Sequence, residues 1–346
     1  MTTLLLSGLA VTAAVCASLT AAVIPLLRRA RVVDVPGDRS LHRTPVPRGG
    51  GLAIVLAASL ATWTAVLAAV HLQGAVHAMS GVDVALMGLA TVLAFALLGL
   101  IEDLFSVSVR ARLVLQLVLG AGLGLVAHSA FEVSLWWTPA ICVGTAALVN
   151  ATNFMDGANG LACGHALLTS LWYVQVAAVA PVAGLGLVMV SVAGACLGFL
   201  PFNTPRAKVF LGDSGSYALG SAWAFAVTAC LSRGVAVEAA LAPVLVLLAD
   251  TGYTLWMRLR AGQCWYAPHR LHVYQRLVCA GWPHWASALL VTLAAAACSA
   301  LAASSLLTSN RLWMPQVAMA AVLILYLKTP SIIGAPNPFP TLRRAR

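Results

Sequence analysis

The sequence predicts an all-α fold, that of a polytopic integral membrane protein with about 11 transmembrane helices. Three observations predict this class. Of the 346 residues, 61% are hydrophobic and only 9% are charged, whereas soluble domains carry roughly 25% charged residues. The mean hydropathy is +0.93. The apolar residues form long runs that no linker or internal repeat divides, so we interpret residues 1–346 as a single transmembrane domain.

A helix that crosses the hydrocarbon core needs roughly 20 apolar residues. The predicted spans lie near 3–27, 50–70, 83–101, 113–129, 134–149, 161–180, 182–201, 214–232, 239–257, 284–306 and 312–328. The first run has no basic residue before it and is followed by Arg28, Arg29 and Arg31, which is typical of a first span with its N-terminus outside and not of a cleaved signal peptide. The eight Cys form no CxxC pair and fall mostly within these runs, so we interpret them as small buried residues, not as disulfides or zinc ligands.

The basic residues lie almost entirely on one side of these spans. Of the 20 Lys and Arg residues, only Arg233 and Arg311 fall on the other side. By the positive-inside rule the basic side is cytoplasmic, with the N-terminus outside and the C-terminus inside. The net charge of +10 therefore indicates a membrane topology and not a nucleic-acid partner. Most of the acidic residues share this side, so we expect an active site on the cytoplasmic face, built from loops at about 28–49, 102–112, 150–160, 202–213 and 258–283.

One polar stretch stands out among these loops. Residues 150–161 read N-A-T-N-F-M-D-G-A-N-G-L and place Asn150, Asn153, Asp156 and Asn159 at three-residue intervals. On a short helix this spacing directs the side chains toward a common region. A polar turn between two helices would explain any one of them. Four together, in a chain with so little charge, indicate the edge of an active site.

The first loop combines basic residues with glycines. Arg39, His42 and Arg48 precede a triple glycine at 49–51. A membrane anchor would explain the arginines that directly follow the first span. The glycines fit better a loop whose backbone N–H groups and basic side chains approach a phosphate.

Two further loops carry carboxylates. Glu102 and Asp103 are adjacent, and such a pair is costly unless a cation or a proton separates the charges. Hard oxygen ligands favour Mg²⁺ or Mn²⁺ over zinc. Asp213 stands at the start of the predicted span 214–232, where it could also serve as a helix N-cap. Lys208 adds positive charge beside it.

The last loop holds a cluster of basic residues. His269 and His272 are spaced i, i+3 and would share a helix face, with Arg270 and Arg276 nearby. Because no third zinc-type ligand is close in sequence, we interpret the cluster as a phosphate-binding group. Asp250 lies within a span, where an acid is functional or pairs with a neighbouring base.

These loops resemble, in order, the motifs of the polyprenyl-phosphate N-acetylhexosamine-1-phosphate transferase family. The matching pieces are R-S-L-H-x-x-P-x-P-R-G-G-G at 39–51, the acidic pair 102–103, N-x-x-N-F-M-D-G-x-N-G-L at 150–161, F-N-x-P-x-A-K-x-F-L-G-D-S-G-S at 202–216 and H-R-x-H at 269–272. The version H-R-x-H-x-Y-Q is similar to that of bacterial enzymes of the glycosyltransferase family 4 type, which start O-antigen and related glycans.

The resemblance implies an enzyme of the bacterial inner membrane that starts O-antigen, lipopolysaccharide or related cell-wall glycan synthesis. It would move a sugar 1-phosphate from a UDP-N-acetylhexosamine to undecaprenyl phosphate, giving undecaprenyl-diphospho-sugar and UMP. Such a transfer needs a divalent cation, Mg²⁺ or Mn²⁺, and basic groups that offset the charge of the diphosphate. No nucleic acid is implied; membrane lipids are, and a homodimer stays open.

The same resemblance implies roles for individual residues. Asn153 and Asp213 would be the metal ligands. Glu102 and Asp103 would orient or activate the lipid phosphate. Asp156 would contact the substrate or lie just outside the metal ligands, and Asn159 would lie near the uracil. The groups expected to hold substrate, mainly through its phosphates, are Arg39, His42, Arg112, Asn150, Lys208, His269, Arg270, His272 and Arg276.

Several alternatives remain open at this point. The chain has Glu102 where the family usually has Asp, and Asn159 where bacterial members often have Asp; an amide still hydrogen-bonds a uracil. The transfer could proceed in one step or through an aspartyl-phosphate at Asp103. A catalytically weak scaffold and a secondary transporter are rival functions, although a transporter predicts charges at mid-membrane and related halves. GlcNAc, FucNAc and QuiNAc are candidate sugars.

Overall fold

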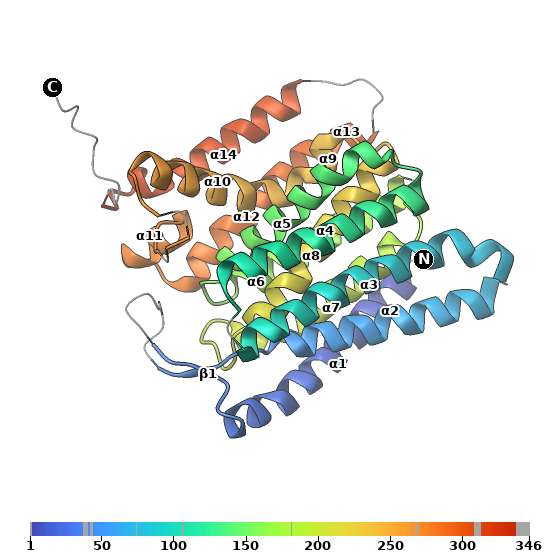
Figure 1. Ribbon diagram of the computed structural model, residues 1–346, viewed down its shortest axis with the longest axis horizontal. Helices are drawn as coiled ribbons and strands as arrows, with labels where there is room; N and C mark the ends of the chain where they lie inside the picture. Colours follow the sequence, from blue (N-terminus) through green and yellow to red (C-terminus); the bar gives the residue numbers. More distant parts are fainter. Residues whose placement is uncertain are drawn as a thin grey trace.

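The computed structural model describes residues 2–36, 41, 44–73, 75–105, 107–180, 182–264, 266–267, 269–307 and 313–336. The prediction of an all-α fold is confirmed (Figure 1). In chain order the helices are α1 (Thr2–Arg29), α2 (Gly51–Gln73), α3 (Ala75–Phe105), α4 (Val109–Phe131), α5 (Thr138–Phe154), α6 (Leu161–Val179), α7 (Leu185–Asn203), α8 (Gly212–Ser232), α9 (Val237–Leu241), α10 (Leu245–Arg260), α11 (Val273–Cys279), α12 (His284–Ala302), α13 (Ser304–Leu307) and α14 (Met314–Ile332).

Short elements connect some of these helices. Two 3-10 turns, η1 (Leu135–Trp137) and η2 (Ala242–Val244), precede α5 and α10. A two-residue hairpin pairs β1 (Val33–Asp34) with β2 (Val46–Pro47) in antiparallel register, with Val33 opposite Pro47. This pairing places the end of the first loop, just before α2, beside the start of the loop, just after α1.

Within the described residues, nine helices are long and apolar enough to cross a membrane. They occupy nine of the predicted spans, and the two other predicted spans, 134–149 and 214–232, are occupied by α5 and α8. α5 has only 17 residues. α8 is buried continuously from Ser214 to Cys230, so it faces other helices on all sides and can carry serines and glycines that a lipid-facing helix would avoid. The chain is a multi-pass membrane protein.

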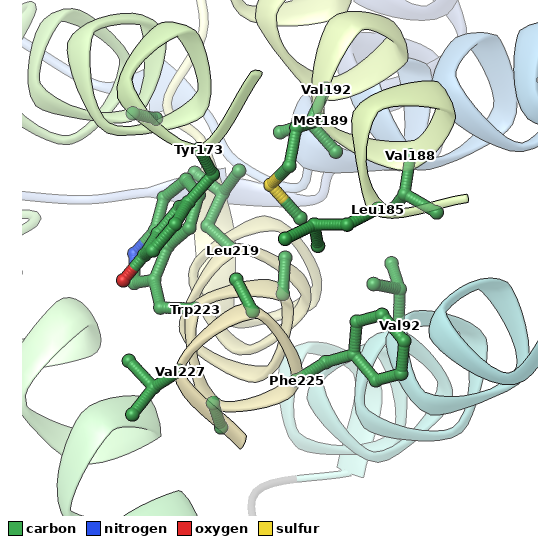
Figure 2. Packing of buried hydrophobic residues seen from close by; sticks show 14 of the residues in the cluster. Val92, Tyr173, Leu185, Val188, Met189, Val192, Leu219, Trp223, Phe225 and Val227 are labelled. Atoms are coloured by element: carbon green, nitrogen blue, oxygen red, sulfur yellow. The ribbon is translucent and has the colours of Figure 1, made fainter. Parts of the chain in front are cut away.

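The packing around α8 forms the centre of the bundle. Figure 2 shows Trp223 and Phe225 of α8 among Tyr173 of α6, Met189 of α7 and Val92 of α3. Trp223, Phe225, Tyr173 and Met189 are fully buried. Burial of such large side chains is the main favourable term in helix packing within a membrane, where close van der Waals contact replaces the hydrophobic effect.

Two glycines let neighbouring helices approach the first turn of α8. A Cβ on Gly99 of α3 would collide with the carbonyl of Asp213, and one on Gly51 of α2 would collide with the backbone of Gly215. Only a glycine fits where two backbones pass so closely. These contacts bring the ends of α3 and α2 against the start of α8.

The loops that the charge pattern assigns to the cytoplasm meet at one end of the bundle. Hydrogen bonds join the backbone of Asp213 to Asp103, Gly160 to Asn203, and Asn159 to His284. Figure 1 shows β1 and α11 at this end and α9 and α13 at the other. The convergence of the loops is thus confirmed, while the orientation of this end in the membrane stays a prediction.

Candidate active site

A cavity of about 310 Å³ opens at the end where the loops meet. It is lined by residues from five different connections between helices. They are Asp34, Leu41, Arg48, Asp103, Asn153, Asp156, Gly157, Ala158, Asn159, Asn203, Phe210, Gly212, Asp213, Gln275 and His284. Five predicted site residues are therefore brought together: Asp103, Asn153, Asp156, Asn159 and Asp213.

Asp103, on the last turn of α3, binds the first turn of α8. Its two carboxylate oxygens accept the backbone N–H groups of Asp213 at 3.1 Å and Ser214 at 3.0 Å. The first N–H groups of a helix lack partners within the helix, and a negative charge beside them is favourable. The N-cap position of α8 is Leu211, which makes no side-chain cap. The capping role considered for Asp213 is thus performed by Asp103.

Glu102 points elsewhere, although it is adjacent in sequence. Its carboxylate accepts from Arg112 Nη1 at 3.1 Å and from the backbone N–H of Val107 at 3.0 Å. Successive side chains on a helix diverge by about 100°, and the two carboxylates accordingly have different partners within the protein. Neither Glu102 nor Arg112 lines the cavity, and Arg112 already has an anionic partner.

Asn153 and Asp213 lie next to each other in the cavity wall. Asn153 is the next-to-last residue of α5, and Asp213 is the second residue of α8. Asn153 Nδ2 donates to Asp213 Oδ1 at 2.5 Å and to Ser216 Oγ at 3.0 Å. The two residues expected to bind metal are thus in direct contact through their polar atoms. Amide and carboxylate oxygens are suitable ligands for a hard divalent cation.

Asp156 occupies the loop that follows α5. Burial, together with the negative charges of Asp213 and Asp103, raises the pKa of the Asp156 carboxyl well above its ordinary value. Four carboxylates, those of Asp34, Asp103, Asp156 and Asp213, thus line one small cavity, and Arg48 is the only Lys or Arg among the described lining residues. Its Nε lies 4.0 Å from Asp103 Oδ1. Its Nη2 donates to the Asp103 carbonyl at 2.8 Å. The excess negative charge favours binding of a further cation.

A further part of the cavity lining consists of amides and a histidine. Asn159 Nδ2 donates to the Pro205 carbonyl at 3.2 Å, and the Asn159 backbone N–H donates to His284 Nδ1 at 3.2 Å. His284 and Gln275 line the cavity and were not identified from the sequence. The available signal was position: His284 is a polar residue directly after Pro283, at the start of α12.

Two glycines of the triple glycine have partners for their backbone N–H groups within the protein. The N–H groups of Gly50 and Gly51 donate to the carbonyls of Phe210 and Leu211 at 2.9 and 2.7 Å. They are therefore used within the protein, and the glycines serve close packing of the loop against the segment before α8. Arg39 and His42 lie outside the described residues.

The predicted phosphate-binding cluster lies behind the cavity wall. Neither His269 nor His272 lines the cavity. His272 is buried, and its Nδ1 lies 3.0 Å from Asp250 Oδ1, so the predicted pairing of Asp250 with a base is confirmed. Burial, followed by the nearby His272 and Arg258, lowers the pKa of His269 to about 4. Because the His269 ring is neutral near pH 7, it is a hydrogen-bonding group and not a cation there.

The remaining predicted substrate-binding residues also lie outside the cavity lining. They are Asn150, Lys208, Arg270 and Arg276. Asn150 Nδ2 donates to Gln116 Oε1 of α4 at 2.5 Å, so it joins two helices. Lys208 Nζ lies 5.9 Å from the centre of the Phe202 ring, and Arg276 Nη2 donates to the Pro336 carbonyl at 3.4 Å. The sequence could not distinguish these structural contacts from contacts to a ligand.

Comparison with known proteins identifies relatives of this chain. A family model described as glycosyl transferase family 4 matches residues 85–231. The chain is 31% identical to a decaprenyl-phosphate N-acetylglucosaminephosphotransferase of Mycobacterium leprae, over 78% of this chain and 75% of the relative. It is 27% identical to a probable undecaprenyl-phosphate N-acetylglucosaminyl 1-phosphate transferase of Bacillus subtilis, over 78% and 77%. A phospho-N-acetylmuramoyl-pentapeptide-transferase of Desulforudis audaxviator is 33% identical over 57% and 68%.

Proposed function

The chain belongs to the family of polyprenyl-phosphate N-acetylhexosamine-1-phosphate transferases, and we propose that it transfers an N-acetylhexosamine 1-phosphate from a UDP-sugar to undecaprenyl phosphate. The observation that carries this proposal is the contact of Asn153 with Asp213, in a small cavity that also holds Asp103 and Asp156. This acid-rich and amide-rich pocket suits the diphosphate of a nucleotide sugar together with a divalent cation.

In the proposed reaction, an oxygen of the acceptor phosphate attacks the phosphorus that carries the sugar. The bond from this phosphorus to the bridging oxygen breaks, and UMP leaves with that oxygen. The acceptor is a phosphate monoester with a second pKa near 6, so at neutral pH it is mostly ionised and needs no base. The protein is required chiefly to position the two phosphates and to offset their charge.

The residues fit Mg²⁺, or Mn²⁺ as an alternative. Within the part of the chain that the structure describes, no group of three or more His, Cys, Asp or Glu side chains forms a ready metal cage. Mg²⁺ does not need one, because it usually binds one or two carboxylates together with substrate phosphates and water. Asp213 would supply the carboxylate and Asn153 its amide oxygen, and the bound cation would stabilise charge on the diphosphate. The raised pKa of Asp156 supports a site whose negative charge is offset by a cation.

The position of Asp103 supports the one-step route. Both of its oxygens accept N–H groups of α8, so its carboxylate is engaged in holding that helix and is poorly placed as a nucleophile. We assign it the role of fixing the start of α8, and with it Asp213, relative to the substrate phosphates. The ion pair between Glu102 and Arg112 shows that the Glu retains a partner, which weakens the case for an inactive scaffold.

The names of the relatives and one sequence motif guide the choice of the sugar donor. Two of the relatives compared above are named for N-acetylglucosamine, so UDP-GlcNAc is the first donor to test. UDP-FucNAc and UDP-QuiNAc follow, because of the H-R-x-H-x-Y-Q motif. We propose a role in starting a cell-envelope glycan; O-antigen is one such glycan.

A transfer assay tests the proposal. Membranes that contain the protein would be incubated with undecaprenyl phosphate, Mg²⁺ and each UDP-N-acetylhexosamine in turn, and UMP and lipid-diphospho-sugar would be measured by mass spectrometry. We expect cation-dependent product with one donor and a loss of at least about 100-fold with Asp213→Asn. Glu238→Gln, in α9 at the opposite end of the bundle, serves as the matched control and should retain activity. No product with any donor, from well-inserted protein, would overturn the proposal.

A further inference from the structure

We propose that Asp250 is a positioning residue for this reaction: from inside α10 it fixes the tautomer and direction of His272 and holds the start of α11 against the loop that carries Asn153 and Asp156. The inference rests on the proposed function. Asp250 does not line the cavity, and none of the residues that hydrogen-bond to its side chain lines the cavity either.

Asp250 is fully buried, with no exposed surface. A carboxylate in such a place must be paired, since an isolated buried charge is very costly. Its oxygens accept from Thr254 Oγ1 of α10 at 3.2 Å and from Tyr326 of α14 at 2.7 Å. They also accept from the Val273 N–H at 3.1 Å, and Oδ1 lies 3.0 Å from His272 Nδ1. One side chain therefore joins α10, α14 and the start of α11.

These contacts determine how α11 begins. His272 is the N-cap residue of α11 and has extended backbone angles, with φ of −60° and ψ of 151°. Gln275 Oε1 accepts the His272 N–H at 3.2 Å, and Asp250 accepts the N–H of the next residue. Gln275 also lines the cavity. A change at Asp250 would therefore be transmitted through α11 to the cavity wall.

The hydrogen bond to Asp250 also determines the tautomer of His272. Both oxygens of Asp250 accept hydrogen bonds from other groups, Oδ1 from Thr254 and the Val273 N–H and Oδ2 from Tyr326. In the proposed arrangement Oδ1 also accepts from Nδ1 of His272, so Nε2 is the atom left for other partners. In His269 the arrangement is reversed, because Nδ1 accepts the Leu271 N–H at 3.3 Å and Nε2 carries the hydrogen. The two rings lie 5.0 Å apart. Other ionisable groups around the pair are Arg258 of α10, Tyr274 and Arg276 of α11, and Tyr326 of α14.

The start of α11 directly contacts the end of α5 and the loop that follows it, which carry Asn153 and Asp156. The His272 ring stacks on Phe154 with 6.1 Å between centres and 29° between planes. Tyr274 donates its hydroxyl hydrogen to the Phe154 carbonyl at 2.9 Å, and a Cβ on Gly157 would collide with the same hydroxyl. Phe154 follows Asn153, and Gly157 follows Asp156. The path from Asp250 to the proposed metal ligands thus consists of packed and hydrogen-bonded neighbours.

The test compares three substitutions in the full-length protein. Asp250→Asn removes the charge but retains the shape, whereas Thr254→Val and Tyr326→Phe each remove one hydrogen bond to Asp250 and leave the bond to His272. For Asp250→Asn we expect kcat to fall at least about tenfold, because loss of a carboxylate that fixes the tautomer of a histidine lowers kcat in other enzymes. We expect the KM for the UDP-sugar to change by less than about threefold and the pH profile of kcat to be displaced. For the two controls we expect a lower Tm with kcat within about threefold of the parent.

A double-substitution cycle asks whether Asp250 acts through His272. His272→Asn keeps an N–H donor near Asp250 but removes Nε2. We expect Asp250→Asn added to His272→Asn to lower kcat by less than about twofold further. If Asp250→Asn alone retained the parent kcat and pH profile, or if its loss of kcat equalled that of controls with the same fall in Tm, the proposal would be overturned.

A readout that does not require turnover separates this proposal from the proposed function. The ¹⁵N spectrum of histidine-labelled protein in detergent distinguishes Nδ1–H from Nε2–H, and the signal of His272 is identified by its absence in His272→Asn. We expect the Nδ1–H form in the parent and loss of that preference in Asp250→Asn. An Nε2–H form in the parent would overturn the positioning role even in active protein, and an inactive parent with the expected spectrum would count against the proposed function only.

Discussion

Asp103 holds the backbone of Asp213, a residue 110 positions later in the chain. The hydrogen bond of 3.1 Å from the Asp213 N–H, with that of 3.0 Å from Ser214, fastens α8 to the last turn of α3. The Asp213 side chain is then directed toward Asn153. Two acidic residues in one cavity thus have different tasks, since one fixes the helix whose first turn presents the other.

Removing the charge of Asp103 tests this division. In Asp103→Asn the amide can accept one N–H but presents its own N–H₂ group to the other, so a cap of about 1–2 kcal/mol is weakened. We expect a lower Tm in detergent and a fall in product formation of at least about tenfold. Mass spectrometry of parent protein quenched during turnover should show no phosphorylated Asp103. A phosphorylated carboxylate at this position would contradict the one-step route.

The ion pair of Glu102 with Arg112 should act as a unit. The two side chains are 12% and 20% exposed, so loss of either partner leaves a poorly solvated charge. We expect Glu102→Gln and Arg112→Gln each to lower the Tm. The double substitution should lower the free energy of unfolding by less than the sum of the two single substitutions, with a coupling of about 0.5–3 kcal/mol. Additive effects in thermal unfolding would show that the pair does not contribute to stability.

The raised pKa of Asp156 predicts a pH-dependent stability. Because the folded protein favours the protonated carboxyl, this group stabilises the fold at low pH, and the contribution is lost as pH rises from the ordinary value of 3.8 through the higher folded value. Without divalent cation, Asp156→Asn should therefore raise the Tm at pH 8, and the gain should shrink as pH falls. The substitution should abolish turnover. A Tm gain that did not vary with pH would contradict this account.

A bound cation should stabilise the protein through Asp213. Ligand at 100 times its dissociation constant adds about 2.7 kcal/mol to the stability of the folded state. We expect Mg²⁺ to raise the Tm of the parent and EDTA to abolish both this rise and turnover. Asp213→Asn should show no rise with Mg²⁺. An equal rise in parent and variant would place the stabilising cation elsewhere.

The close approach of α3 to α8 can be tested with two glycines. Gly99→Ala would push its Cβ into the carbonyl of Asp213, whereas Gly122→Ala in α4 meets no atom within 4 Å. We expect Gly99→Ala to cost about 1–3 kcal/mol and to lower activity, because it displaces the first turn of α8. Gly122→Ala should leave the Tm unchanged or raise it, since Ala favours a helix by up to about 1 kcal/mol. Equal effects of both substitutions on the Tm would contradict the close packing.

The order of the helices and five of the residues that line the cavity could be predicted from the sequence. The runs at 161–180 and 182–201 form α6 and α7, because a long apolar segment satisfies its own backbone hydrogen bonds as a helix, whatever its neighbours. Asn153, Asp156 and Asp213 were expected to converge and do so, because alternating spans return successive loops to the same end of a bundle.

The partners of individual polar groups were decided only by the tertiary structure. Glu102 and Asp103 are adjacent, yet one binds Arg112 and the other the backbone of α8. Asp250 receives a hydrogen bond from Tyr326, 76 residues later. A hydrogen bond needs its atoms within about 3 Å and well aligned, and such geometry depends on how distant helices pack. Sequence alone therefore determined which residue types gather at this end of the protein, and the fold determined which of them face the cavity.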